Sequence, residues 1–184
     1  MTENQYTKGE LAKKILKHLA LGGAVIVCTA VPGMAQVLKM FAPKNRYERN
    51  KIGRSFRNLK RQKIVKIYVK NDKEVIEITE RGKMRLLQYQ FEDMKIKRPK
   101  PWDGRWRMIM FDIPVKKDRA RKLLRLKLNE LGFRQYQKSV FVAPFECKKE
   151  IDFIAHYLSL EKFIKYIAAD YLDGQEILKK SFKL

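Results

Sequence analysis

The sequence has few residues of the kinds that build metal centres or disulfide networks. Its 184 residues include two cysteines, Cys28 and Cys147, and two histidines, His18 and His156. No CxxC pair occurs and the spacings match no pattern of metal ligands, so neither a disulfide framework nor a zinc site is indicated. The motifs HExxH, GxSxG and GxxxxGK followed by Ser or Thr are also absent. This composition fits a protein of the reducing cytoplasm without the usual signatures of a hydrolase.

Acidic side chains are scarce relative to basic ones. The chain has 42 Lys and Arg against 20 Asp and Glu, a formal net charge of +22. Residues 43–98 hold 18 of the basic and 7 of the acidic side chains. An excess of this size calls for a polyanionic partner, first of all nucleic acid, with an anionic membrane surface as the alternative.

Residues 19–38 form the only long stretch without a charged side chain. Its length meets that of a membrane span. Gly22, Gly23, Pro32 and Gly33 interrupt the run, which favours two or three short helices buried in a core or a subunit interface. A membrane anchor remains the alternative, with the basic region lying on anionic lipid.

The first half of the chain contains an amphipathic helix dense in positive charge. A capping box at Thr7 and Glu10 predicts a helix over residues 8–21, and a second helical stretch is expected to end by Pro43. From residue 46 to 62 the spacing of Ile52, Phe56 and Leu59 predicts a helix with one apolar face. Residues 44–63 contain one acid, Glu48, and nine basic residues: Lys44, Arg46, Arg49, Lys51, Arg54, Arg57, Lys60, Arg61 and Lys63. We interpret this helix as one that meets phosphates, against the alternative of a merely solvated face.

Two β-branched runs follow, residues 64–69 and 75–78, joined by a polar loop. Thr79 is placed to cap a further helix. Helices, a basic helix, a hairpin and a helix, in that order, are the layout of a winged helix-turn-helix domain, in which the helix before the hairpin enters the major groove. The residues that we expect to bind duplex DNA are Arg46, Arg49, Asn50, Lys51, Arg54, Arg57, Lys60, Arg61, Lys70 and Lys73.

Residues 95–101, KIKRPKP, have little to bury and are predicted to be a linker. The predicted domains are therefore 1–94, helical with the winged helix, and 102–184. In the second, expected strands at 106–112, 134–142 and 163–169 alternate with expected helices at 116–131 and 150–158; residues 134–142 fit one bent strand or a tight pair. This alternation predicts a ferredoxin-like βαββαβ domain, so that the fold class is α+β.

The run WRMIMFDIP, residues 106–114, is a short apolar strand that ends on an acid and a proline. Asp112 is a candidate catalytic and metal-binding residue, with Asp170 as a possible neighbour because it also ends a strand. Alternatively, Asp112 caps the following helix beside Lys116 and Lys117, or pairs with Arg105 or Arg107. Four aromatic residues are interpreted as core or interface residues, against the alternative of a base-stacking platform: Trp102, Trp106, Phe133 and Tyr136.

The motifs MIMFDIP and Gln137-Lys138-Ser139-Val140-Phe141 resemble the small CRISPR-associated endonuclease of the second Cas family over about residues 103–170. That resemblance implies a homodimer in which the residue matching Asp112 in each subunit helps to hold magnesium. The tail QEILKKSFKL and the linked winged helix look like the phenylacetate-operon repressor family, PaaX, in which a winged helix precedes a domain of this endonuclease-like fold. The second resemblance covers more of the chain.

The sequence thus predicts a DNA-binding transcriptional regulator that acts as a repressor and a homodimer, with no required cofactor. The alternative is a magnesium-dependent endonuclease acting on RNA or DNA through Asp112. A single carboxylate rarely suffices for phosphodiester hydrolysis, which ranks the regulator first.

Overall fold

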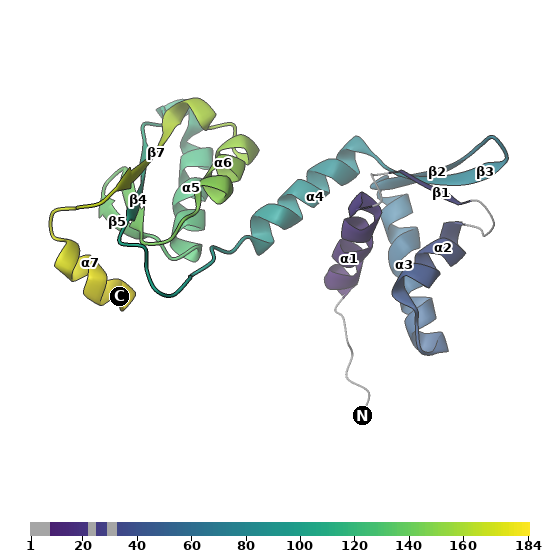
Figure 1. Ribbon diagram of the computed structural model, residues 1–184. Helices are drawn as coiled ribbons and strands as arrows, with labels where there is room; N and C mark the ends of the chain where they lie inside the picture. Colours follow the sequence, from purple (N-terminus) through teal and green to yellow (C-terminus); the bar gives the residue numbers. More distant parts are fainter. Residues whose placement is uncertain (1–7, 22–24, 29–32) are drawn as a thin grey trace. The chain divides into compact units, whose positions relative to one another are not determined.

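The computed structural model describes residues 8–21, 25–28 and 33–184, and forms two compact units, Met1–Gln90 and Phe91–Leu184 (Figure 1). Each unit has helices and one antiparallel sheet, so that the chain is α+β, as predicted. Thr7 of the expected capping box lies outside the described residues.

The first unit has a three-stranded sheet with the strand order β1-β3-β2, in which both pairings are antiparallel. The central strand β3 pairs with β2 along a hairpin and with β1 from the other side. The first unit contains α1 (Lys8–Leu21), β1 (Val25–Cys28), α2 (Gly33–Phe41), α3 (Arg46–Arg61), β2 (Val65–Lys70), β3 (Lys73–Ile78) and most of α4 (Glu80–Asp93).

The apolar run 19–38 contains a strand where only helices were expected, and that expectation was wrong for residues 25–28. The strand β1 pairs with β3 in a register that sets Val27 opposite Val75. Backbone hydrogen bonding to β3 explains the difference, because a short β-branched run gains a ladder partner that no local pattern reveals. Among the described helices, none is long and apolar enough to cross a membrane.

Helix α3 packs into the core of the first unit with the face that the sequence predicts. Ile52, Phe56 and Leu59 are buried and pack in one cluster with residues of α1, β2 and β3. Leu16 of α1 and Ile76 of β3 lie in the same cluster and are fully buried. Burial of side chains of this size stabilises a fold by about 2 kcal/mol each.

The hairpin and α4 approach each other closely at Gly82. The Thr79 hydroxyl accepts a hydrogen bond from the Gly82 amide at 3.1 Å and donates to the Lys63 carbonyl oxygen at 2.6 Å, while the Thr79 amide donates to the Ile64 carbonyl oxygen at 3.1 Å. A Cβ atom at Gly82 would lie 2.2 Å from that carbonyl oxygen. The start of α4 therefore depends on Thr79 as a cap, as expected, and on the absence of a side chain at position 82.

The second unit has a four-stranded antiparallel sheet in the order β5-β6-β4-β7. With one helix after the first strand and one after the third, this is the predicted ferredoxin-like βαββαβ arrangement. Residues 134–142 form the tight pair of strands rather than one bent strand. The elements are β4 (Trp106–Phe111), the short helix η1 (Val115–Lys117), α5 (Asp118–Glu130), β5 (Arg134–Gln137), β6 (Val140–Ala143), α6 (Lys148–Tyr157), the short helix η2 (Glu161–Phe163), β7 (Ile164–Ala169) and α7 (Gln175–Phe182).

The aromatic residues considered as a stacking platform pack within the second unit. Trp106 and Phe133 are buried, and the Trp102 ring lies 4.9 Å from that of Trp106 between ring centroids. Tyr136 is partly buried and its hydroxyl donates to the Asp173 carbonyl oxygen at 3.1 Å. These four aromatic side chains therefore belong to the packing of the second unit, as the sequence favoured.

The residues before β4 belong to the second unit. Phe91, Met94 and Ile96 pack against its main core, whereas the sequence placed the end of the first domain at residue 94 and a linker over 95–101. Lys127 of α5 is 3% exposed, and its amine lies 3.3 Å from the Glu92 carbonyl oxygen and 3.0 Å from the Glu130 carboxylate. These contacts fix the segment after residue 91 to α5.

A buried arginine anchors the loop before β4. Arg107 is 4% exposed and donates to the Asp103 carboxylate at 2.7 Å and to the Glu146 carboxylate at 3.3 Å. Hydrogen bonds from Arg107 lower the pKa of Asp103 to about 2. The same ion pairs compensate the charge of Arg107. Burial of this charge without a partner would cost several kcal/mol of folding free energy.

This pair predicts a specific pH dependence of stability. Because the pKa of Asp103 is below its usual value of 3.8 in the folded chain, its contribution is complete above that value and is lost as the pH falls through about 2. We expect Asp103→Asn to destabilise the second unit by about 1 kcal/mol at pH 7, a modest value because the carboxylate is half exposed. The difference from the native chain should close between pH 4 and pH 2, as followed by urea unfolding with tryptophan fluorescence. Asp173→Asn is the control, and a pH-independent difference would contradict the assignment.

Candidate nucleic-acid interface

Helix α3 begins at a capping interaction that involves Glu48, the one acid among residues 44–63. The side chain of Asn45 accepts a hydrogen bond from the Glu48 amide at 2.8 Å. In return, the Glu48 carboxylate accepts from the Lys44 amide at 2.9 Å. Glu48 is thus engaged at the start of the helix and forms no described ion pair with the basic side chains farther along it.

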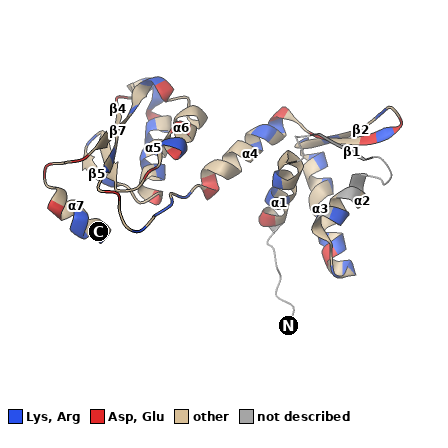
Figure 2. Ribbon diagram, viewed as in Figure 1, with Lys and Arg blue, Asp and Glu red and all other residues tan. Residues whose placement is uncertain are grey.

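Opposite its buried face, α3 presents a stripe of long polar side chains. Tyr47, Asn50, Arg54, Arg57 and Arg61 recur at intervals of three and four residues and are exposed. Figure 2 shows basic residues along the helix. Sequence reasoning missed Tyr47, which is 60% exposed, although its position three residues before Asn50 places it on the same face.

The other predicted residues of α3 flank this stripe. Arg46, Arg49 and Lys60 are exposed on one side of it, and Lys51 is partly buried on the other. The structure therefore brings all eight predicted residues of α3 to one surface or its borders: Arg46, Arg49, Asn50, Lys51, Arg54, Arg57, Lys60 and Arg61. We call this surface the basic face.

Most of the basic face lacks compensating charge. Within the described part of the chain, Arg46, Arg49, Arg54, Arg57 and Lys60 form no ion pair, and Arg61 donates to the uncharged Asn58 amide oxygen at 3.0 Å. The second unit differs, because several of its basic side chains are paired with carboxylates: Arg105, Arg107, Arg121, Lys122, Lys127, Lys148 and Lys179. Charge that is left uncompensated on one helix face produces a strong local positive potential.

The hairpin after α3 carries two further predicted residues at its tip. Lys70 and Lys73 are exposed and face each other in the β2-β3 register. The turn between them places Asn71 and Asp72 at φ values of 53° and 56°, a left-handed conformation that these two residue types tolerate. Like charges directly opposite each other are unfavourable in a hairpin unless an anion lies between them.

Lower on the hairpin, Glu77 is a shared acceptor. Its carboxylate lies 3.0 Å from the Lys66 amine and accepts from the Tyr68 hydroxyl at 2.9 Å. The hydrogen bond from Lys66, followed by that from Tyr68, holds the pKa of Glu77 below its usual value. Lys66 is thus paired with Glu77, whereas Lys70 and Lys73 form no ion pair with described residues.

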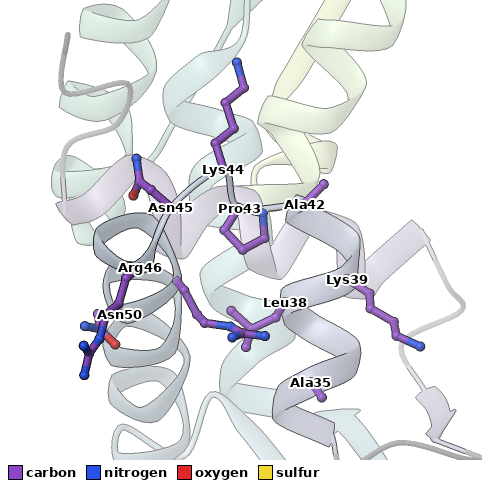
Figure 3. Close-up of a pocket in the computed structure, with 10 residues that line it drawn as sticks. Ala35, Leu38, Lys39, Ala42, Pro43, Lys44, Asn45, Arg46 and Asn50 are labelled. Atoms are coloured by element: carbon purple, nitrogen blue, oxygen red, sulfur yellow. The ribbon is translucent and has the colours of Figure 1, made fainter.

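A groove separates α2 from the start of α3. It has a volume of about 850 Å³ and is lined by Leu38, Lys39, Lys44, Arg46 and Arg49 among others (Figure 3). A second depression of about 530 Å³ lies on the other side of α3 and includes Tyr47, Arg54 and Arg61. Both depressions are lined in part by the basic face, the first by Arg46, Arg49 and Asn50 and the second by Tyr47, Arg54, Arg57 and Arg61.

Asp112 and Asp170 lie far apart in the second unit. It is exposed at the end of β4, where its amide donates to the Phe163 carbonyl oxygen at 3.0 Å. Trp106 pairs with Ala169 and Phe111 with Ile164, so Asp112 and Asp170 lie at opposite ends of the antiparallel pair β4 and β7. Asp170 lies opposite position 105, so at about 3.4 Å per residue the two residues are about 24 Å apart along the strands. Asp170, which the sequence left open as a neighbour of Asp112, is therefore not one within this chain.

The alternative partners proposed for Asp112 are also engaged elsewhere. Arg105 pairs with Asp170 at 3.1 Å, and Arg107 pairs with Asp103 and Glu146. No three His, Cys, Asp or Glu side chains in the described ranges gather as metal ligands. One chain thus offers a divalent cation a single carboxylate at Asp112, which does not fit a magnesium site that needs several oxygen ligands, and we derive no catalytic step there.

The chain was compared with curated proteins and with models of protein families. No curated protein matches the chain. A family model described as the PaaX protein central Cas2-like domain matches residues 99–180. This match agrees with the strand order of the second unit and supports the resemblance to the PaaX family there; the first unit lies outside the matched residues. The second unit is accordingly similar to the Cas2-like central domain of PaaX proteins.

Proposed function

We propose that this protein is a DNA-binding transcriptional regulator, with residues 8–78 forming a winged helix-turn-helix. In this assignment α2 and α3 are the two helices of the motif, and β2 and β3 form the wing. The observation that carries the proposal is the basic face: exposed arginines along one helix, without carboxylate partners in the described chain.

The arrangement of side chains supports two kinds of contact with duplex DNA, one with base edges and one with phosphates. Asn50, Arg54 and Arg57 lie on the centre line of α3, opposite its buried residues, where a helix in the major groove faces the base edges. Arg46, Arg49 and Lys60 lie to the side, and Lys70 and Lys73 at the wing tip; these positions suit phosphate contacts. Tyr47 adds an exposed aromatic ring to the centre line.

The second unit supports two more specific proposals, that the protein is a repressor and that it is a homodimer. It is similar to the central domain of PaaX proteins, and the resemblance of the chain to the phenylacetate-operon repressor family favours a repressor. We propose that the second unit also joins two copies of the chain, so that the protein acts as a homodimer on a DNA site with two half-sites.

The test is selection of bound sequences from random duplex DNA by the full chain, with and without magnesium. We expect a recurrent sequence motif, no dependence of enrichment on magnesium, and intact DNA after binding. If about six phosphates are neutralised, the logarithm of the binding constant should fall with the logarithm of the salt concentration with a slope of about −5. Enrichment of no motif would argue against a regulator, and cutting that Asp112→Asn abolishes would instead indicate a nuclease.

A further inference from the structure

Four basic residues precede the first strand of the second unit, outside the basic face. They are Lys95, Lys97, Arg98 and Lys100, and all four side chains are exposed. We propose that residues 95–100, the basic segment, form a second binding site for duplex DNA phosphates on this protein. This inference rests on the proposed function and adds a contact site to it.

The backbone of the basic segment is anchored although its charges are exposed. Residues 94–99 form no helix or strand, yet Met94 and Ile96 pack against the main core of the second unit. The buried Lys127 amine holds the Glu92 carbonyl oxygen just upstream. An anchored segment loses less conformational entropy on binding than a free tail, which favours its use as a binding element.

The charges of the basic segment are not neutralised within the protein. Lys95, Lys97, Arg98 and Lys100 form no ion pair with a carboxylate in the described ranges. Elsewhere in the same unit, Arg105, Arg121 and Lys148 do have such partners. The nearest acids in sequence have interactions of their own, Glu92 and Asp93 before the segment and Asp103, which pairs with Arg107, after it.

Arg98 has a defined position at the end of α5. A Cβ atom on Gly132 would lie 2.6 Å from the Arg98 guanidinium, so the glycine leaves room for this side chain. Gly132 has φ 90°, a left-handed conformation that ends the helix. The C-terminal end of a helix favours a nearby cation, which suits this position of Arg98, and the three lysines are the further phosphate ligands of the segment.

Binding to phosphates predicts a change in the salt dependence of DNA affinity. We expect replacement of Lys95, Lys97, Arg98 and Lys100 by glutamine in the full chain to make the slope of log affinity against log salt shallower by about 2 to 4. A second variant replaces only the three lysines and keeps Arg98, so that the end of α5 is undisturbed; its slope should change by about 2 to 3. Thermal unfolding followed by tryptophan fluorescence checks that both variants retain the second unit.

The matched control removes the same number of charges elsewhere in the second unit. Lys149, Lys162, Lys180 and Lys183 are exposed and have no ion pair with described residues. Their replacement by glutamine should leave the slope within about 1 of the native value, since general charge acts weakly at a distance in salt.

The outcomes separate this inference from the proposed function. If the native chain binds duplex DNA and substitution of the basic segment leaves the slope unchanged, or changes it no more than the control does, the second site is refuted while the proposed function stands. Failure of the native chain to bind duplex DNA refutes the proposed function itself. Loss of binding to phosphatidylserine vesicles with an unchanged DNA slope would assign the basic segment to a membrane surface and overturn the inference.

Discussion

Replacing both Arg54 and Arg57 by glutamate should lower the affinity for duplex DNA by about a hundredfold or more at moderate salt, because each arginine contact is worth about 1–3 kcal/mol. Both side chains are exposed on the centre line of α3 and have no carboxylate partner in the described chain. The substitution therefore removes two attractive contacts and adds two repulsive ones without uncovering a buried group. Fluorescence anisotropy with a labelled duplex at several salt concentrations measures the change.

The control for this double variant carries the same change in net charge. Arg119→Glu with Lys149→Glu alters two exposed residues of the second unit that have no ion pair with described residues. We expect it to weaken binding by less than about tenfold, through general electrostatics alone. An equal loss in both variants would mean that α3 is not the recognition element.

Gly82→Ala should destabilise the first unit by about 2 to 3 kcal/mol, although alanine is the better helix former by about 1 kcal/mol. The added Cβ would lie 2.2 Å from the Ile64 carbonyl oxygen and 2.6 Å from the Ile78 side chain. That carbonyl cannot easily move, because the Thr79 amide donates to it at 3.1 Å and the Thr79 hydroxyl holds the preceding Lys63 carbonyl oxygen at 2.6 Å. The close approach therefore outweighs the gain in helix propensity.

The two tryptophans allow this effect to be located. Both Trp102 and Trp106 lie in the second unit, so urea unfolding by fluorescence reports on that unit and circular dichroism reports on both. Gly82→Ala should lower the midpoint of the dichroism transition by about 1 M urea and leave the fluorescence transition in place.

Gly9→Ala provides the matched control for Gly82→Ala. Gly9 lies in α1 with no atom within 4 Å of a new Cβ, so the substitution should be neutral or stabilise the first unit by up to about 1 kcal/mol. Equal effects of the two substitutions would show that close packing at Gly82 is not the cause.

Local patterns predicted the parts of this fold that local physics determines. The spacing of Ile52, Phe56 and Leu59 fixed the buried face of α3 and thereby the position of its basic residues. Thr79 could be recognised as a cap because its neighbours in the sequence form the structure that it caps. The alternation of strands and helices after residue 105 was sufficient for the ferredoxin-like fold.

The features that the sequence did not reveal depend on pairing between distant residues. The strand β1 exists because Val27 meets Val75, and an apolar run of four residues carries no sign of such a partner. The separation of Asp112 from Asp170 follows from the antiparallel register of β4 and β7. Arg107 is committed to Glu146, which is remote in sequence, and so it is not a partner of Asp112.

On the proposed function, the facing lysines at the tip of the hairpin link the stability of the first unit to DNA binding. Lys70 and Lys73 repel each other in the native register, as do the neighbouring cations of α3, so folding without a polyanion concentrates like charge at a cost in stability. A duplex that binds only the folded form offsets this repulsion and raises the free energy of unfolding. Molecules without DNA would then be unfolded and degraded more often than those that hold a site, and the supply of sites would regulate the lifetime of their own regulator.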